Sequence, residues 1–270
     1  MRDSGDFEVP DPTVIVDRRG PVLVMTLNRP QARNALNLDA LRRLAEAYTE
    51  LTEDGGLRCG VVRAEGSTFC AGLDLADVIP EAIRSGSGSY LEAGQRDPFR
   101  MYAEGCEKPI IVAVHGRCFT AGLELVLAAD ICIAAAGSEF GQQETTRGIM
   151  PMGGATFRLP RAIGWAPAMN CMLAGGRFSA EQAAAWGLVT ELCPAESLDE
   201  VAFAVAERVA SCAPLAVQAA LRNARLGESQ GLPAAIEDVR VEARRICLTD
   251  DAREGMASLL EKRVADFLGR

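Results

Sequence analysis

Short apolar runs alternate with amphipathic segments along the first two thirds of the chain. Residues 13–28, TVIVDRRGPVLVMTLN, predict two short strands around an Arg-Gly-Pro turn. Residues 37–54 predict an amphipathic helix that has Asn37 as its N-cap and ends at Gly55-Gly56. The apolar face of this helix consists of Leu38, Leu41, Leu44, Ala45 and Tyr48.

Three further apolar runs predict buried strands, at residues 59–66, 109–116 and 131–136. Their alternation with helical segments predicts an α/β fold with short parallel strands. Residues 83–98, IRSGSGSYLEAGQRDP, are polar and rich in Gly and Ser. This segment is either a mobile loop near a ligand or a plain surface linker.

Helices dominate after about residue 160. The sequence predicts a helix, a Gly break and a short strand over 180–194, and then helices over 197–211, 213–226, 232–248 and 250–268. We expect three parts: a flexible leader (1–12), a core (13–200) and a C-terminal helical region (201–270). The last two helices are amphipathic, and they can pack on a core of their own or on a neighbouring subunit.

Composition narrows the classes of function. The chain has 270 residues, 49% of them hydrophobic, and a net charge of −9, so nucleic acid is not an expected partner. No apolar run is long enough to predict a membrane span, so no membrane partner is expected. The nine cysteines include no C-x-x-C pair, which predicts reduced thiols in a cytoplasmic protein and no metal site. The single histidine, His115, ends a strand-like run and is assigned a structural role.

One carboxylate interrupts the apolar stretch FTAGLELVLAADICIAAAG, residues 119–137. Glu124 lies in the first turn of the helix that this stretch predicts. A carboxylate removed from water must be paired, hydrogen-bonded or protonated. Glu124 is therefore either a helix-start acid bonded to free backbone amides or a catalytic acid in an apolar pocket.

Three segments carry candidate chemistry. In 66–78, GSTFCAGLDLADV, a helix starting near Asp74 would expose backbone amides that can hold a developing oxyanion. In 116–130, Thr120 can cap the helix, and the amide of Ala121 and the carboxylate of Glu124 can face one cavity. In 138–164, a second acid, Glu144, lies in a Gly-bounded segment before PMGG.

These segments, in this order, resemble the enoyl-CoA hydratase/isomerase (crotonase) superfamily. The resemblance covers residues 13–268 and includes LNRPQARNALN (27–37), the AGLD segment, the Gly-x-Glu helix, FGQQE and the C-terminal DDAREGMASLLEKRVADF. It implies a crotonase-like spiral of repeated ββα units, followed by a C-terminal helical trimerisation region. Homotrimers, or hexamers built as dimers of trimers, are the expected assemblies.

The resemblance also assigns residues. The backbone amides of Leu73 and Ala121 would form an oxyanion hole, and Glu124 and Glu144 would be the two catalytic acids. Family members usually carry glycine at the position of Ala121, but a backbone donor allows alanine. The implied substrate is an acyl-CoA thioester, with no separate cofactor because coenzyme A is part of the substrate. The implied CoA-binding residues are Ala32, Arg33, Ala71, Asp74 and Leu75, and also Lys262.

A pair of acids favours hydration of a 2-enoyl-CoA to a 3-hydroxyacyl-CoA. The alternatives are another crotonase-type reaction, namely double-bond isomerisation, dehydration of a polar acyl-CoA or thioester hydrolysis, and a non-catalytic acyl-CoA-binding subunit. GATFRLPRAIG follows Glu144 where family members tend to carry a Gly-Gly-Thr-Gln stretch, so Ala155, Thr156 and Phe157 can reshape the acyl pocket or a subunit contact.

Overall fold

The main sheet has six strands in the order β1-β2-β3-β4-β6-β9. The computed structural model describes residues 11–86 and 88–270. The sheet opens with the antiparallel hairpin that the sequence predicts, β1 (Val14–Arg19) and β2 (Val22–Leu27). The other strands are all parallel to β2: β3 (Cys59–Ala64), β4 (Ile110–Val114), β6 (Ile131–Ala135) and β9 (Glu191–Cys193).

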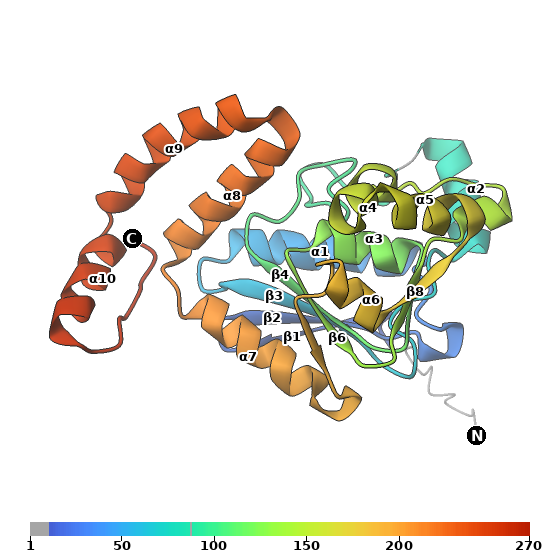
Figure 1. The fold of residues 1–270 in the computed structure, drawn as a ribbon, viewed down its shortest axis with the longest axis horizontal. Helices are drawn as coiled ribbons and strands as arrows, with labels where there is room; N and C mark the ends of the chain where they lie inside the picture. The colour runs from blue at the N-terminus through green and yellow to red at the C-terminus, as the bar shows by residue number, and fades with distance from the viewer. Residues whose placement is uncertain (1–10, 87) are drawn as a thin grey trace, which may run out of the picture.

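Helices cover both faces of this sheet, which explains the continuous apolar runs of its central strands. Figure 1 shows α1 (Leu38–Glu53) and α3 (Ala121–Ala128) on one side and α7 (Leu198–Ala210) on the other. The predicted cap of α1 is confirmed, because the side chain of Asn37 accepts a hydrogen bond from the amide of Ala40 at 2.9 Å. The fold is of the α/β class, as the sequence predicts.

A smaller sheet lies beside the first and carries part of the candidate site. It has the order β5-β7-β8, formed by β5 (Arg117–Phe119), β7 (Glu139–Gly141) and β8 (Arg177–Ser179). A parallel bridge between Cys70 and Cys118 joins β5 to the AGLD segment. Segments far apart in the sequence therefore meet at this edge.

Short helices connect the strands around the site. They are η1 (Pro30–Ala32), α2 (Leu75–Ser85), η2 (Glu144–Arg147), α4 (Ala155–Ile163), α5 (Trp165–Ala174), α6 (Ala180–Ala185) and η3 (Ala195–Ser197). Two sequence predictions are confirmed here. Helix α2 starts directly after Asp74, and α6 is followed by a break and then the short strand β9. The sequence did not indicate α4 or α5, since Gly154, Pro160 and Gly164 look like breaks.

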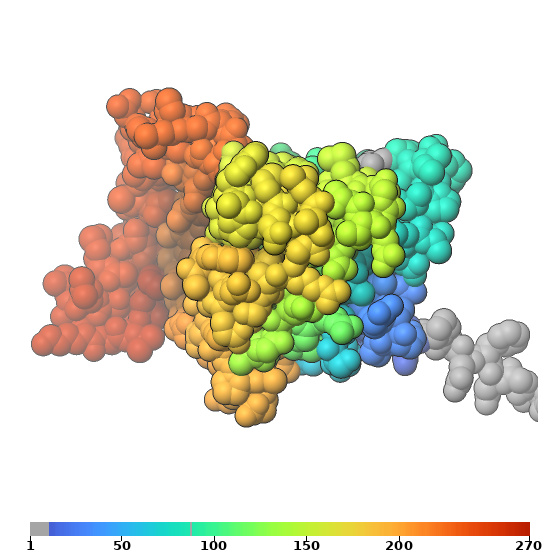
Figure 2. Space-filling view, turned by 45° about the vertical axis from the view of Figure 1, so that its right-hand side comes forward, coloured from blue at the N-terminus to red at the C-terminus, as the bar shows by residue number. Residues whose placement is uncertain are grey.

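The C-terminal helices α8 (Pro214–Gln230), α9 (Leu232–Cys247) and α10 (Asp250–Glu261) stand away from the sheet (Figures 1 and 2). By contrast, α7 packs on the sheet through Leu198, Ala202, Val205 and Ala206. The predicted helix over 250–268 is too long, because the backbone turns left-handed at Lys262 (φ 57°) and ends α10. The predicted leader falls almost wholly on residues 1–10, which lie outside the described residues.

The remaining expectations concern thiols, histidine and membrane segments. Seven of the nine cysteines are buried, and all nine are free. The ring of His115 contacts the carbonyl of Gly66 at 2.9 Å, in keeping with a structural role. In residues 11–86 and 88–270, no helix is both long and apolar enough to cross a bilayer.

Gly60 provides a test of how tightly α1 packs on the sheet. A Cβ at this position would lie 2.7 Å from Met25 Cε and 2.8 Å from Leu51 Cδ2. We expect Gly60→Ala to lower the free energy of unfolding by about 1–3 kcal/mol through overpacking. Urea denaturation measures this change. Gly55→Ala is the control, because a Cβ there meets no atom within 4 Å; equal stability of the two variants would contradict the prediction.

Candidate active site

Two tight turns meet at the start of α3. Gly72 has φ +113°, and a Cβ there would lie 1.8 Å from the Thr120 Oγ1 atom, so only glycine fits. Thr120 itself has φ 52° and ψ −118°, a strained conformation for a residue with a side chain. It occupies the N-cap position that the sequence predicts, but its side chain makes no capping hydrogen bond. Contact between Gly72 and Thr120 fixes the two turns relative to one another.

This contact leaves two backbone amides directed at one cavity. The carbonyl of Gly72 and the amide of Asp74 both bond Leu36, so the intervening amide of Leu73 points to the opposite side. The amide of Ala121 is the first of α3 and has no acceptor within its own helix. Among the described residues, no hydrogen bond uses the amide of Leu73 or of Ala121.

Glu124 is almost completely buried, at 3% exposure. Its Oε1 atom accepts hydrogen bonds from the amides of Gly153, at 2.7 Å, and Ala155, at 3.1 Å. The pKa of Glu124 is raised to about 7: burial is the main cause and the charge of Glu144 adds to it, while these two amides act in the opposite direction. Glu124 is therefore poised to change protonation state near neutral pH.

Glu144, in η2, is the second buried carboxylate, at 7% exposure. The side-chain nitrogen of Gln142, in the orientation that satisfies both groups, donates to the two carboxylate oxygens at 2.8 Å. Burial raises the pKa of Glu144 to about 7, although the backbone amides of Glu144 and Gln143 oppose this shift. Both acids therefore have raised pKa values, and the charge of Glu144 is one of the causes of the shift at Glu124.

Two cavities meet at Glu124, and Glu144 lines the larger of them. The larger cavity, of about 300 Å³, is lined by both acids, by Leu73 and by Ala121. The smaller one, of about 50 Å³, is walled by apolar and aromatic side chains. The two cavities share Leu73, Ala121, Glu124 and Met152. A molecule extending from one cavity into the other would pass both free amides and the carboxylate of Glu124.

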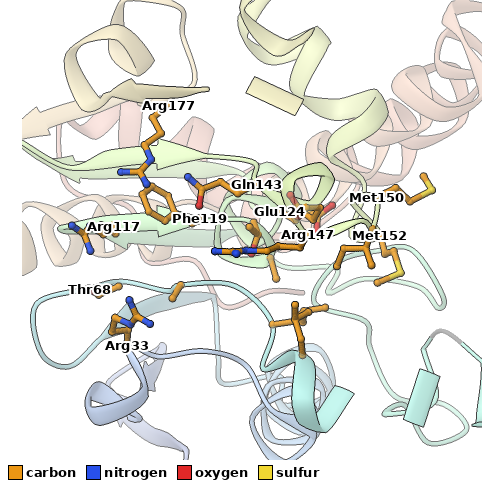
Figure 3. Close-up of a pocket in the computed structure, with 17 residues that line it drawn as sticks. Arg33, Thr68, Arg117, Phe119, Glu124, Gln143, Arg147, Met150, Met152 and Arg177 are labelled. Atoms are coloured by element: carbon orange, nitrogen blue, oxygen red, sulfur yellow. The ribbon is translucent and has the colours of Figure 1, made fainter. Parts of the chain in front are cut away.

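Four arginines line the larger cavity although the protein is acidic overall: Arg33, Arg117, Arg147 and Arg177. Figure 3 shows Arg33, Arg117 and Arg177 gathered toward one end, and Met150 and Met152 at the other. Arg177 lies over the ring of Phe119, 5.0 Å from its centroid, and pairs with Glu139. This cavity therefore offers a cationic end for an anionic group and leads to a buried acid pair.

The family model described as enoyl-CoA hydratase/isomerase matches residues 17–270. The chain belongs to the enoyl-CoA hydratase/isomerase family. The 2,3-dehydroadipyl-CoA hydratase of Escherichia coli (strain K12) is 34% identical over 257 residues, covering 95% of this chain and 99% of the relative. Enoyl-CoA hydratase EchA19 of Mycobacterium tuberculosis is 33% identical over 266 residues, covering 96% and 97%.

A solved structure agrees with this membership. A probable enoyl-CoA hydratase/isomerase from Mycobacterium abscessus has a TM-score of 0.91 and 43% identity, covering 96% of this chain and 99% of that one. The crotonase-type fold and the resemblance to enoyl-CoA hydratases/isomerases expected from the sequence are thereby confirmed.

The structure of this family member brings most of the predicted site residues together. The larger cavity is lined by Glu124, Glu144, Leu73, Ala121, Arg33, Ala71 and Leu75. Ala32 and Asp74 are next in sequence to residues that line the larger cavity, but they line neither cavity themselves. Asp74 forms an ion pair with Arg29 at 3.1 Å. Lys262, at the end of α10, also lines neither of these two cavities.

The segment Ala155–Phe157, expected to reshape the acyl pocket or a subunit contact, lies beside Glu124. Ala155 contributes its amide to Glu124. Phe157 is exposed and contacts the Arg158 guanidinium, and it lines neither of the two cavities. This stretch therefore shapes the surroundings of the acid and does not line the apolar cavity.

Several contributors were missed from the sequence. Gln142 precedes Glu144 by two residues, and Arg147 follows it by three, so the FGQQETTR run held a signal for both. Arg177 carried no such signal, because only the pairing of β8 with β7 brings it to the cavity. The described residues contain no group of three or more His, Cys, Asp and Glu placed to hold a metal ion.

The raised pKa of Glu144 predicts a pH-dependent stability. An acid whose folded pKa is raised above its unfolded value stabilises the protein below that unfolded value and loses this contribution as pH rises through about 4.5 to 7. At pH 8, urea denaturation should therefore give Glu144→Gln a free energy of unfolding about 1–3 kcal/mol higher than that of the wild type. This difference should disappear near pH 5. Glu53→Gln, at an exposed acid, is the control. A Glu144→Gln variant no more stable than the wild type at pH 8 would refute this.

Proposed function

We propose that the protein is an enoyl-CoA hydratase, which adds water across the 2,3 double bond of a 2-enoyl-CoA to give a 3-hydroxyacyl-CoA. One observation carries the proposal: two buried carboxylates, Glu124 and Glu144, line the same cavity as the free amides of Leu73 and Ala121. Hydration requires a carbonyl polarised at its oxygen, a directed water and a proton for the α-carbon, and these groups supply each of them.

Each part of the substrate has a matching region. The phosphates of coenzyme A suit the arginine-lined end, where Arg33 is the residue that the resemblance already assigns to CoA. Ala71 and Leu75 line the same cavity along the path of the pantetheine and adenine, with Ala32 and Asp74 beside it. The thioester would then lie at the junction, and the acyl chain would enter the apolar cavity. No cofactor is invoked, since coenzyme A belongs to the substrate.

The residues have separate roles in this mechanism. The amides of Leu73 and Ala121 donate to the thioester oxygen and, with the dipole of α3, stabilise the enolate charge. Glu124, ionised and fixed by two amides, directs and activates the water. Glu144 exchanges the proton with the α-carbon. The raised pKa values, about 7 for both acids, suit proton transfer near neutral pH.

Replacement of either acid by glutamine tests the mechanism. We expect Glu124→Gln and Glu144→Gln each to lower kcat for crotonyl-CoA by about 10²–10⁴-fold, because each removes a proton-transfer group. Loss of the enoyl-thioester absorbance gives the rate, and a product heavier by one water identifies hydration. An unchanged mass would indicate isomerisation, free coenzyme A would indicate thioester hydrolysis, and binding without turnover would indicate a non-catalytic subunit.

The apolar cavity further suggests an uncharged acyl chain. Leu38, Leu41 and Val78 line it, and within the described residues no lysine or arginine does. The buried carboxylate of Asp97 lies behind this wall, bonded to the Tyr90 hydroxyl at 2.7 Å. A carboxylate at the end of the acyl chain would be desolvated there without a cation lining the cavity. Such a substrate would place the enzyme in the breakdown of fatty acyl groups.

Two substrates that differ only at the chain end test this assignment. 2-Hexenoyl-CoA ends in a methyl group, whereas 2,3-dehydroadipyl-CoA, the compound in the name of the Escherichia coli relative, ends in a carboxylate. We expect kcat/KM to favour the hexenoyl ester by about 10²-fold or more. Comparable values for the two esters would overturn the assignment of an uncharged acyl chain and leave the hydratase assignment intact.

The C-terminal helices support a homotrimer, or a hexamer of two trimers, as part of the proposal. Their exposed side chains include an apolar set that the described part of the chain leaves uncovered: Leu232, Ile236, Val239, Val241, Leu248, Met256, Leu259 and Leu260. Subunit contact is the usual reason for such a surface. A cytoplasmic location suits the free, mostly buried cysteines.

Light scattering after gel filtration tests the assembly. The wild type should have three or six times the mass of one chain. Leu260→Glu, which places a charge at a side chain that is 83% exposed, should reduce this mass. Glu237→Lys, at an exposed residue on the same helical region, is the control. A monomeric wild type would contradict the prediction.

A further inference from the structure

Among the described residues, Arg158 is a buried cation without an acidic partner in direct contact. It is 8% exposed, and its guanidinium donates to three carbonyls: Phe99 O at 2.7 Å, Gly153 O at 3.1 Å and Arg100 O at 3.2 Å. Burying a guanidinium without a carboxylate is unfavourable, so this arrangement calls for a specific gain. All three acceptors lie in the two segments that surround Glu124 and the apolar cavity.

One of these segments holds Glu124. The amide of Gly153 donates to Glu124, and the carbonyl of the same residue accepts from Arg158. Arg158 also lies on α4, whose first residue, Ala155, supplies the second amide. The packing leaves no slack, because a Cβ on Gly153 would lie 2.7 Å from Glu124 Oε2 and one on Gly154 would lie 2.6 Å from Arg158 Nη1.

The other segment forms a wall of the apolar cavity, to which Phe99 and Tyr102 both belong. Asp97, at 0% exposure, organises it by accepting from the amides of Phe99, Met101 and Tyr102 at 2.8–2.9 Å. Arg158 then bonds the carbonyl of Phe99. The same guanidinium therefore joins the wall of the apolar cavity to the segment that orients Glu124.

We propose that Arg158 is a positioning residue, which holds the Gly153 and Ala155 amides on Glu124 by tying their segment to the Phe99 segment. The inference rests on the proposed function, since Glu124 is the group that directs water. The proposal also couples the acyl cavity to the acid. An acyl chain that contacts Phe99 would act, through the Phe99 carbonyl, on the guanidinium that fixes the orientation of Glu124.

Electrostatics agree with this geometry. The positive charge of Arg158 lowers the pKa of Glu124, opposing burial and the charge of Glu144. Arg158 is faced by Arg100 and Asp97 from the cavity-wall segment and by Glu228 from α8. Burial and Arg100 lower its own pKa to about 10, so it remains charged at neutral pH. Removal of its charge would raise the pKa of Glu124.

Three variants test the proposal: Arg158→Met, Arg158→Lys and, as matched control, Arg161→Met. Arg161 lies one turn further along α4 and is exposed, pairing with Glu228 at 3.3 Å. We expect Arg158→Met to lower kcat about 10²-fold with KM for crotonyl-CoA changed less than about 3-fold. The acid limb of its kcat profile should move to higher pH. Arg161→Met should match the wild type.

Arg158→Lys separates charge from shape. Lysine keeps the charge but cannot bond three carbonyls with a planar fork. Because the charge stays while the two amides are held less firmly, we expect its acid limb to move less than that of Arg158→Met while kcat falls about 10-fold. Folded Arg158→Met with wild-type kcat and an unmoved limb would overturn the proposal. If the methionine variant does not fold, wild-type kcat in Arg158→Lys overturns it.

A measurement without turnover distinguishes this inference from the proposed function. Absence of hydration by the wild type would refute the hydratase assignment. The carboxyl carbon of Glu124 can still be titrated by ¹³C NMR, with Glu124→Gln identifying its signal. An upward pKa shift in Arg158→Met, absent in Arg161→Met, supports the positioning role, and an unshifted titration overturns it.

Discussion

The desolvation of two carboxylates is the constraint on which the rest of the site depends. Glu124 and Glu144 are both almost fully buried, and neither forms an ion pair with any residue that the structure describes. Glu124 is instead held by two amides, which requires the 153–155 segment to lie against α3. That segment in turn requires Gly153, because a Cβ would collide with the carboxylate. The backbone around the acids is therefore as specific as the acids themselves.

Charge is distributed unevenly around this pair. The chain has a net charge of −9, yet four arginines line its larger cavity. The same cavity is lined by two acids whose pKa values are about 7. Arginines near the acids would lower their pKa values and keep them ionised. Three of the four, Arg33, Arg117 and Arg177, gather toward one end in Figure 3, and Arg147 lies nearer Glu124. The cationic end that can attract an anionic ligand is therefore separate from the acids that titrate.

Much of this arrangement could be predicted from the sequence, where local patterns decide the outcome. Periodicity indicated α1 and its Asn37 cap, and the apolar runs indicated the parallel strands. An acid inside an apolar helix marked Glu124. What the sequence did not reveal depends on contacts between distant segments: Arg177 reaches the cavity through strand pairing.

The same limit explains the errors at helix boundaries. The helix predicted over 250–268 is too long, because its amphipathic pattern continues past Lys262, where the backbone turns left-handed and α10 ends. No helix was predicted over 155–163, although α4 forms there and continues through Pro160. In both cases local propensity conflicted with a conformation that the surrounding structure decides.

The junction between the two cavities has a consequence for how enzymes of this kind diverge. Among the described residues, only Leu73, Ala121, Glu124 and Met152 belong to both cavities. The apolar walls come from α1, α2 and the segment around residues 88–102, whereas both acids sit on α3 and η2. Mutations that enlarge or change the polarity of the acyl end can therefore accumulate while the proton-handling groups stay intact. A lineage built on this scaffold can explore new substrates without first giving up its chemistry.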